Sequence, residues 1–502
     1  MTEHAINISG SHEYWTKLAT TSPLPSELWI GGEWRSARHG RSTPLTSPGT
    51  GMDVTHVAAA QDADVDDAVR GALDAFKNGP WAKMNPRDRG DVLIRWADLV
   101  EENRDEVAML ISVEMGKPIS VAWEVELKTG IALLRWYGEL ADKLMDESPR
   151  GRAESIALVT REPLGVVAAI TPWNFPITLS LFKIPAALVS GNSVVLKPAS
   201  QSPLSALRLA ELGTQAGLPA GVFNVITGSG SLVGKALATH PDVATLTFTG
   251  STGVGKQLLH YAGDSNAKPI WLELGGKSAN IIFPDAPDLS DASATAAWAI
   301  WFNSGQMCTA GSRLLVHRSV HDQVVDDVVR HFKSLKIGDP LDPETQVGPL
   351  SSKGHQASVA SEVATGIASG ARLVHGSDMA PSGTGFFFPP AMFDDVHPDS
   401  RLAQHEIFGP VLSVIPFADE AEAIDIANNS DFGLGSAVWT SDIGRVHRVS
   451  RNLQAGLVWV NCFEEGDASV PFGGRKLSGH GVDKSAHGID KYTALKTTWI
   501  KL

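Results

Sequence analysis

The sequence predicts an α/β protein of two domains, each built on a mostly parallel sheet with helices on both faces. Its 502 residues correspond to two to four domains at about 100–200 residues each. Hydrophobic residues make up 43% and charged residues 20%, which is typical of a folded globular chain and not of a disordered one. From residue 165 onward, short continuous apolar runs alternate with amphipathic segments, and this alternation is the pattern of βαβ units.

The first third of the chain is expected to hold a short β region and two amphipathic helices. The β region covers residues 28–34. Apolar residues recur at helical spacing over 64–76 and again in the segment that follows Pro86, so each of these helices is predicted to bury one face.

The rest of the chain reads as strands that alternate with helices. Strands are predicted at 165–170, 193–196, 222–226, 245–248, 270–272, 314–317, 411–416 and 457–461. Helices are predicted at 202–217, 289–303 and 320–335. Ser202 followed by Pro203 is typical of a helix start, and we expect Ser202 to cap helix 202–217. The boundary between the two domains is expected near residues 273–276.

Charge and cysteine content limit the classes of function. With 42 Lys+Arg against 56 Asp+Glu, the net charge is −14 and no basic cluster occurs, which argues against nucleic acid or an anionic membrane as a partner. Two cysteines, Cys308 and Cys462, exclude a disulfide scaffold. The first residues lack a signal-peptide pattern and no apolar run of about 20 residues occurs, so a cytoplasmic location is expected. No metal site is expected.

One glycine-rich turn invites a nucleotide interpretation. The segment from Gly250 to Lys256 has the glycine and lysine positions of a phosphate-binding loop, but Gln257 stands where a Mg²⁺-binding Ser or Thr is required. Hydrolysis of a nucleoside triphosphate is therefore not expected. A strand that runs into such a turn and opens a helix still presents free N–H groups to an anion. We expect this turn to bind a cofactor pyrophosphate, with a plain tight turn as the alternative.

Two residues are candidates for covalent and acid–base chemistry. Cys308 lies in a polar loop between Gly305 and Gly311, which favours an exposed nucleophile over the commoner core cysteine. Glu273 ends an apolar strand, where a carboxylate with a raised pKa suits a general base; a simple salt bridge is the alternative. Cys462 follows a strand and is interpreted as a core residue.

Seven short motifs occur in a fixed order along the chain. They are Thr171–Pro176 (TPWNFP), Val195–Pro198 (VLKP), Phe248–Thr252 (FTGST), Leu272–Lys277 (LELGGK), Gly305–Cys308 (GQMC), Glu406–Pro410 (EIFGP) and Pro471–Gly474 (PFGG). With these motifs the chain resembles the NAD(P)-dependent aldehyde dehydrogenase superfamily, from about residue 25 to residue 502.

The resemblance implies an aldehyde dehydrogenase fold with three parts. A Rossmann-like NAD(P)-binding domain would take residues 1–139 and 160–272, and an α/β catalytic domain would take residues 273–484. A small β element for oligomerisation would take residues 140–159 and 485–502, so a homodimer or homotetramer is expected.

The resemblance also implies oxidation of an aldehyde to a carboxylic acid. Cys308 would attack the aldehyde to give a thiohemiacetal, whose oxyanion the Asn174 side chain and the Cys308 backbone N–H would hold. Hydride transfer to the cofactor would leave a thioester, which water activated by Glu273 would hydrolyse. Lys183 would relay protons behind the oxyanion site, and Asp483 stands where many members carry a glutamate of the proton path.

The cofactor, NAD or NADP, would be held by residues carried over from the same motifs. They are Trp173, Lys197, Ser200, Gly250, Ser251, Glu406 and Phe408. Lys197 would bind a ribose, Ser251 the pyrophosphate and Glu406 the nicotinamide ribose. Ser200 replaces the Glu that NAD-preferring members commonly carry, and the loss of that carboxylate predicts use of both cofactors.

The substrate mouth would be lined by the segment 461–472. The residues assigned to it are Phe182, Glu465, Asp467 and Phe472. Gly466 stands where several members place an aromatic residue, and this wide, acidic opening resembles the 4-(γ-glutamylamino)butanal and related ω-aminoaldehyde dehydrogenases.

Several alternatives remain open. The acidic residues of the mouth could form a merely solvated rim, and the substrate could be an aromatic or medium aliphatic aldehyde. A catalytically silent binding or structural member is a further alternative, which intact Cys308, Glu273 and Asn174 argue against. An acylating enzyme that passes its thioester on would have no use for Glu273.

Overall fold

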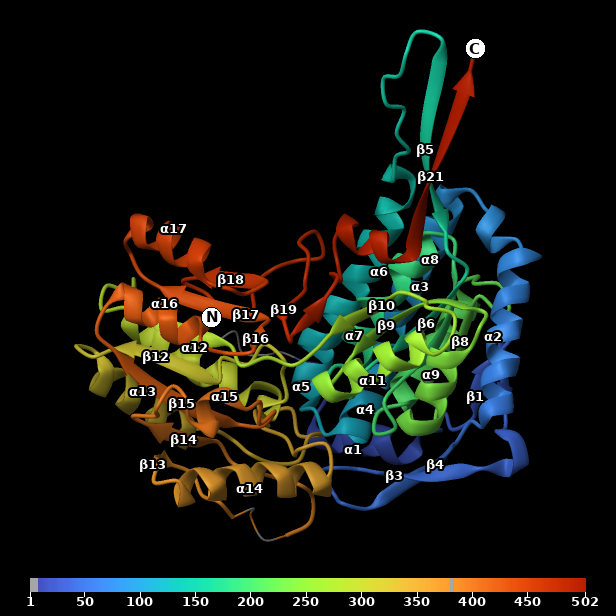
Figure 1. Cartoon of the computed structure of the whole chain (residues 1–502). Helices are drawn as coiled ribbons and strands as arrows, with labels where there is room; N and C mark the ends of the chain where they lie inside the picture. Colours follow the sequence, from blue (N-terminus) through green and yellow to red (C-terminus); the bar gives the residue numbers. More distant parts are fainter. Residues whose placement is uncertain (1–7, 380, 382) are drawn as a thin grey trace.

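The chain folds into two sheet-centred bodies and a projecting two-stranded arm (Figure 1). The computed structural model describes residues 8–379, 381 and 383–502; residues 1–7, the start of the first predicted domain, lie outside the described residues. The predicted α/β class with mostly parallel sheets is confirmed. Within the described residues, every helix is too short or too polar to span a membrane.

The first body is built on an eight-stranded sheet of order β2-β1-β8-β7-β6-β9-β10-β20. The strands are β1 (Leu28–Ile30), β2 (Glu33–Arg35), β6 (Val166–Ile170), β7 (Ser193–Lys197), β8 (Phe223–Val225), β9 (Val243–Thr249), β10 (Ile270–Glu273) and β20 (Gly479–His480). The five strands from β8 to β10 in this order are parallel and almost wholly buried, which explains their continuous apolar runs. The chain adds β7 and β8 on one side of β6 but β9 and β10 on the other, so the direction of winding reverses between β6 and β9.

Helices cover both faces of this sheet. Alternate residues of β6 enter different cores: Val167 and Ala169 face one, while Val166 and Ala168 face the other. The first core is closed by α3 (Pro86–Glu102), α4 (Arg104–Met115), α6 (Lys128–Leu140) and α9 (Leu204–Gln215). The second is closed by α2 (Asp62–Lys77), α10 (Lys235–Thr239) and α11 (Thr252–Gly263).

The start of α9 differs from the sequence prediction. The helix begins at Leu204, and the Ser202 hydroxyl has no hydrogen-bond partner among the described residues. Instead the Glu114 carboxylate of α4 accepts the N–H groups of Leu204 (2.5 Å) and Ser205 (3.3 Å). The predicted Ser202 cap is therefore wrong, because a buried acid from a neighbouring helix supplies the acceptor.

The second body is built on a seven-stranded sheet of order β13-β14-β15-β12-β11-β17-β18, parallel except for the β13–β14 pair. The strands are β11 (Ala279–Ile282), β12 (Arg313–His317), β13 (Arg372–His375), β14 (Ala391–Asp394), β15 (Val411–Phe417), β17 (Gly435–Trp439) and β18 (Leu457–Val460). On one face lie α12 (Leu289–Trp301) and α13 (His321–Lys333). On the other lie α14 (Lys353–Ala368), α15 (Arg401–Gln404), α16 (Glu420–Asn428) and α17 (Ile443–Asn452).

The arm consists of β5 (Ser155–Pro163) and β21 (Thr493–Lys501), paired antiparallel from Thr493 opposite Pro163 to Lys501 opposite Ser155. In Figure 1 it rises away from the first body and carries the C-terminus. Its side chains remain open to solvent: Leu495 is 61% and Trp499 59% exposed. β5 continues to Pro163, beyond residue 159 where the sequence analysis ended this element.

Shorter elements complete the described chain. They are α1 (His12–Thr21), β3 (Ser42–Thr46), β4 (Asp53–Ala58), α5 (Ile119–Val121), α7 (Pro176–Leu181), α8 (Ile184–Val189), β16 (Phe432–Gly433) and β19 (Arg475–Lys476). The strand β20, from the segment assigned to the second domain, pairs with β10 at the edge of the first sheet. The C-terminal segment therefore links the two bodies close to Glu273.

Candidate active site

Cys308 sits in a braced turn that follows α12. The backbone of Asn303 and Ser304 adopts positive φ angles of 49° and 56°, which L-residues rarely take up. The Gln306 side chain holds this turn: it donates to the Asn303 carbonyl (3.0 Å) and accepts the N–H of Ser351 (2.9 Å). The Cys308 thiol is thereby presented, half-buried, from a fixed backbone.

Asn174 faces the same turn from the first body. It follows β6 and precedes α7, and its side chain is 3% exposed. Its amide nitrogen donates to the Gln306 carbonyl at 2.9 Å, two residues before Cys308. The Asn303 amide donates back to the Asn174 carbonyl at 3.0 Å. The two predicted catalytic residues, Asn174 and Cys308, are therefore brought together.

A buried ion pair that the sequence analysis missed fixes the start of α7. The Glu126 carboxylate accepts the N–H groups of Ile177 (2.8 Å) and Thr178 (3.3 Å), and its other oxygen pairs with Lys117. Both charged side chains are fully buried, and the Lys117 ammonium lies 3.6 Å from the centre of the Phe175 ring. Because Phe175 follows Asn174 directly, this pair holds the backbone that carries the Asn174 amide.

Glu273 ends β10 and is 5% exposed. Neither carboxylate oxygen has a hydrogen-bond partner among the described residues. Burial, and after it the Asp483 carboxylate, raises the pKa of Glu273 well above its usual value, while Lys183 and Lys491 oppose that shift. Glu273 therefore has the environment of a general base and not that of a salt-bridged acid.

Lys183 and Asp483 form a buried cluster with Lys491. The Lys183 ammonium donates to Asp483 Oδ2 at 2.6 Å, and the Lys491 ammonium pairs with the other oxygen. Although burial alone would raise it, the two ammonium groups hold the pKa of Asp483 below its usual value. The Asp483 backbone also pairs with Phe472 in both directions (2.7 and 2.8 Å), which joins the cluster to the predicted substrate wall. Lys491 was not anticipated from the sequence.

The thiol of Cys308 is surrounded by acidic groups. Burial first, and then the carboxylates of Glu464, Glu406 and Glu273, raise the pKa of Cys308. A thiol in such a field stays protonated at neutral pH, so it needs a base to become a nucleophile. Cys462 lies elsewhere, half-buried against Trp459 and Phe463 in a separate apolar cluster.

Five of the seven predicted cofactor residues lie at the carboxyl ends of central strands of the first sheet, close to the reversal of winding between β6 and β9. Trp173 follows β6, Lys197 ends β7 and Ser200 follows it, and Gly250 and Ser251 follow β9. In open parallel sheets the crevice at this reversal, beyond the carboxyl ends of the strands, is where dinucleotides bind.

The start of α11 fits a cofactor pyrophosphate. The Ser251 hydroxyl caps the helix by accepting the N–H of Val254 at 3.5 Å. Gly253 and Val254 in the first turn are exposed, so the positive end of the helix dipole faces open space. At the end of β7, Lys197 is buried and donates to the Pro198 carbonyl at 2.8 Å, and burial lowers its pKa to about 8. Ser200 donates to the Gly228 carbonyl at 3.0 Å.

Glu406 and Phe408, the other two predicted cofactor residues, lie in the segment between α15 and β15. Glu406 accepts the Gly276 N–H at 2.9 Å, and burial raises its pKa to about 7. The Phe408 ring stands edge-on to Trp173 at 5.4 Å. Gly276 is required here, because a Cβ at 276 would collide with the Cys308 backbone carbonyl, whereas a Cβ at 275 would displace the Glu406 carboxylate.

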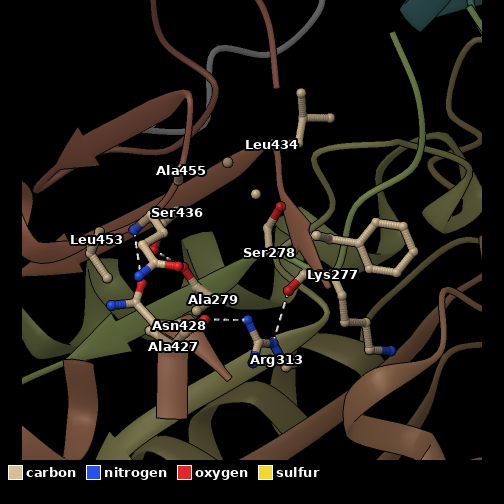
Figure 2. Close-up of a pocket in the computed structure, with 14 residues that line it drawn as sticks. Lys277, Ser278, Ala279, Arg313, Ala427, Asn428, Leu434, Ser436, Leu453 and Ala455 are labelled. Atoms are coloured by element: carbon tan, nitrogen blue, oxygen red, sulfur yellow. Dashed lines mark hydrogen bonds between the residues drawn. The ribbon is translucent and has the colours of Figure 1, made fainter. Parts of the chain in front are cut away.

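A small hollow behind this segment has a structural role. Figure 2 shows Arg313 in it, donating to the Lys277 carbonyl at 2.8 Å and to the Ala427 carbonyl at 2.7 Å. Its volume of about 20 Å³ is enough for about one water molecule. Arg313 therefore anchors the segment that carries Gly276, and the hollow is too small to hold an aldehyde.

On the substrate side, Phe182 and Phe472 meet edge-on at 5.4 Å. Glu465 and Asp467 lie on the exposed outer face of their loop. The Asp467 carboxylate accepts the Ser469 N–H at 2.8 Å, which turns it along the surface. The third acid of this segment, Glu464, faces inward, and its carboxylate contributes to the raised pKa of the Cys308 thiol.

The winding reversal of the first sheet, the free cysteine Cys308 and the buried, unpartnered carboxylate of Glu273 are together the features expected of a dehydrogenase that uses a cysteine nucleophile. The family model described as the aldehyde dehydrogenase family matches residues 34–498. The chain therefore belongs to the aldehyde dehydrogenase family, and the prediction of an NAD(P)-dependent oxidoreductase is confirmed.

Three relatives illustrate the similarity. The NADP/NAD-dependent aldehyde dehydrogenase PuuC of Escherichia coli is 44% identical over 489 residues, which cover 97% of this chain and 98% of that protein. The structure of the P. syringae indole-3-acetaldehyde dehydrogenase with NAD+ and IAA matches with a TM-score of 0.97 and 48% identity, covering 98% of this chain and 100% of that chain. The γ-glutamyl-γ-aminobutyraldehyde dehydrogenase of Burkholderia cenocepacia matches with a TM-score of 0.96 and 46% identity, again covering 98% and 100%.

Proposed function

We propose that this protein oxidises an ω-amino or γ-glutamylamino aldehyde to the carboxylic acid, with NAD+ or NADP+ as the oxidant. The observation that carries the proposal is the occurrence in one site of the Cys308 thiol and the buried Glu273 carboxylate, which lacks a partner among the described residues. An enzyme that releases an acid from a cysteine thioester needs such a base. A silent member or an acylating enzyme does not.

In the proposed reaction the Cys308 sulfur adds to the aldehyde carbon. The oxyanion that results is held by the Asn174 amide, which already donates beside Cys308, and by the Cys308 backbone N–H. When bound, the oxidised nicotinamide supplies the acceptor for the hydride that leaves this adduct. Cys308 then carries the acyl group as a thioester.

Glu273 is the proposed base for both halves of the reaction. A carboxylate with a raised pKa accepts the thiol proton when Cys308 attacks, and later accepts a proton from the water that hydrolyses the thioester. Between these steps the proton must leave Glu273. Lys183 and Asp483, which belong to the same buried cluster, are the proposed route for it.

The proposed cofactor residues fall into three groups, each of which binds one part of the dinucleotide. Gly250 and Ser251, at the start of α11, take the pyrophosphate. Lys197 and Ser200 take the adenosine ribose. Glu406 takes the nicotinamide ribose, and the Trp173 and Phe408 rings line that end of the crevice.

The substrate class is supported by the acidic mouth and by the names of two relatives. One is the γ-glutamyl-γ-aminobutyraldehyde dehydrogenase of Burkholderia cenocepacia, at 46% identity, and the other is an aminoacetaldehyde dehydrogenase of Pseudomonas aeruginosa, at 42% identity. The indole-3-acetaldehyde dehydrogenase, at 48% identity, and the Phe182–Phe472 pair favour an aromatic aldehyde as the second candidate. Values of kcat/KM for 3-aminopropanal, 4-(γ-glutamylamino)butanal, indole-3-acetaldehyde and hexanal decide between them; a clear preference for the indole aldehyde would overturn the amine assignment.

Two substitutions test the catalytic roles. We expect Cys308→Ala to abolish formation of reduced cofactor, while the matched Cys462→Ala variant keeps its activity. We expect Glu273→Gln to give at most a single burst of reduced cofactor and to accumulate a thioester, visible by mass spectrometry after acid quenching. Steady turnover by Cys308→Ala, or an unchanged steady rate in Glu273→Gln, would contradict the mechanism.

The domain roles are part of the same proposal. We assign cofactor binding to residues 1–139 and 160–272, catalysis to 273–484 and oligomerisation to 140–159 and 485–502. The exposed Leu495 and Trp499 of the arm support assembly into a homodimer or homotetramer, which sedimentation velocity tests. The cytoplasmic location stays a prediction.

A further inference from the structure

Glu464 is half-buried near the nucleophile, and one oxygen of its carboxylate is fully buried and unpartnered among the described residues. Its Oε1 atom is shielded from solvent and has no hydrogen-bond partner among the described residues. Thr309, whose hydroxyl lies against this carboxylate, directly follows Cys308 in the chain. A buried acceptor left open in this way costs free energy unless a ligand completes it.

The loop is built to turn Glu464 inward. Glu464 has a φ of 59°, a conformation that glutamate rarely adopts. On one side the Asn461 side chain is bonded to the Thr440 backbone (2.9 and 3.0 Å), and on the other the Trp459 indole donates to the Glu465 carbonyl at 2.8 Å. Strain that is held by bonds on both flanks is typical of a functional position.

The charges around the Glu464 carboxylate leave it without a direct ion pair among the described side chains. Burial raises the pKa of Glu464 to about 7, and the Thr309 hydroxyl and the Lys484 ammonium act against that shift. Lys484 lies over the Phe182 ring at 5.7 Å, and no ion pair within 4.0 Å joins it to Glu464 among the described side chains. The Lys484 ammonium therefore acts on the pKa of Glu464 from a distance, without a direct ion pair that would neutralise the carboxylate.

We propose that Glu464 is the specificity-determining residue that binds the N–H group of the substrate, as an ammonium or as an amide, close to the aldehyde carbon on Cys308. Phe182 and Phe472 form the apolar wall along which the intervening methylene groups lie. The inference rests on the proposed function and deepens it. It transfers recognition from the exposed Glu465 and Asp467 to Glu464, the acid of the same loop whose carboxylate acts on the Cys308 thiol.

The test compares three aldehydes that differ in the group at the third carbon; the first and last have the same length, and the second is longer by an acetyl group. They are 3-aminopropanal (an ammonium), N-acetyl-3-aminopropanal (an amide N–H) and butanal (a methyl group). Glu464→Gln removes the charge but keeps an oxygen acceptor and the side-chain volume. We expect kcat/KM to fall at least tenfold for 3-aminopropanal, two- to threefold for the amide and less than twofold for butanal.

Two further variants make the outcome specific. Glu465→Gln removes a charge from the same loop, and we expect it to change kcat/KM for 3-aminopropanal less than twofold. Glu464→Asp keeps the charge but retracts it by one methylene group, and we expect an intermediate loss; it also replaces Glu464→Gln if that variant does not fold. The rate with butanal reports whether each variant is folded.

The possible results separate the two levels of the argument. If the wild-type enzyme prefers the nitrogen-containing aldehydes and Glu464→Gln leaves that preference intact, the Glu464 assignment is overturned and the proposed substrate class stands. If Glu465→Gln matches Glu464→Gln, general acidity of the mouth explains the preference and the assignment is again overturned. If the wild-type enzyme shows no preference over butanal, the proposed substrate class fails together with this inference.

Discussion

Substitution of Lys491 by Met tests whether the buried charge cluster sets the pKa of Glu273. Lys491 pairs with the same Asp483 carboxylate that accepts the Lys183 ammonium at 2.6 Å. Both lysines oppose the rise in the Glu273 pKa that burial and Asp483 cause. Removing one cation leaves two carboxylates near a single ammonium, so the pKa of Glu273 should rise further.

The expected size of this shift follows from electrostatics. Two unit charges about 8 Å apart interact by about 2 kcal/mol at an effective dielectric constant of about 20. Since about 1.4 kcal/mol corresponds to one pKa unit, the pKa of Glu273 should increase by about one unit. Glu273 acts as a base only when it is ionised. A higher pKa therefore moves the acid limb of the pH profile to higher pH, with about a tenfold loss of kcat below the limb.

The assay is kcat at saturating aldehyde and cofactor, measured from about pH 5 to pH 10 at constant ionic strength. Recovery of the Lys491→Met variant toward the wild-type rate at high pH would establish that the protein is folded. Lys336→Met, which removes an exposed lysine paired with Asp342 and Glu344, is the control and should leave the acid limb in place. An acid limb that stays put, or that moves to lower pH, would refute the electrostatic argument.

Two more predictions concern the cofactor and the stability of the oxyanion site. Ser200→Glu should lower kcat/KM for NADP+ by about tenfold or more and leave kcat/KM for NAD+ nearly unchanged. The reason is that a carboxylate about 6 Å from a 2′-phosphate is repelled by about 3 kcal/mol at an effective dielectric constant of about 20. Equal losses for both cofactors would show that Ser200 does not lie at the 2′ position. Lys117→Met should destabilise the protein by about 3–5 kcal/mol, because Glu126 keeps a buried and uncompensated charge. The double variant Lys117→Met/Glu126→Gln should recover part of that loss in urea denaturation, and a double variant that is less stable than the single one would contradict this explanation.

Much of the fold could be predicted because the information is local. A strand buried on both faces, such as β6, is apolar at every position, and it appears in the sequence as a continuous run. Helices such as α2 show their buried face through the spacing of apolar residues. The Ser202 cap failed for the opposite reason: its replacement, Glu114, lies 90 residues away in the chain, and no local pattern connects it to Leu204.

The candidate site shows the same difference between residues with a local sequence signal and residues without one. Glu273 and Cys308 could be chosen from the sequence because each has an unusual local setting, a carboxylate at the end of an apolar strand and a thiol between glycines. Lys491 and Glu126 could not, since their importance depends on partners in other elements.

The segment 464–467 contains three acids, Glu464, Glu465 and Asp467, which look alike in the sequence. Only the fold gives them different surroundings. A positive φ at Glu464, bonds on both flanks and a turn at Asp467 direct one carboxylate toward the thiol and the others to solvent. In an extended strand, neighbouring side chains point to opposite faces, but in a loop the direction is set by individual hydrogen bonds. The proposed recognition of the substrate therefore depends on the side-chain direction at a single loop position, which is the property that sequence patterns describe least well.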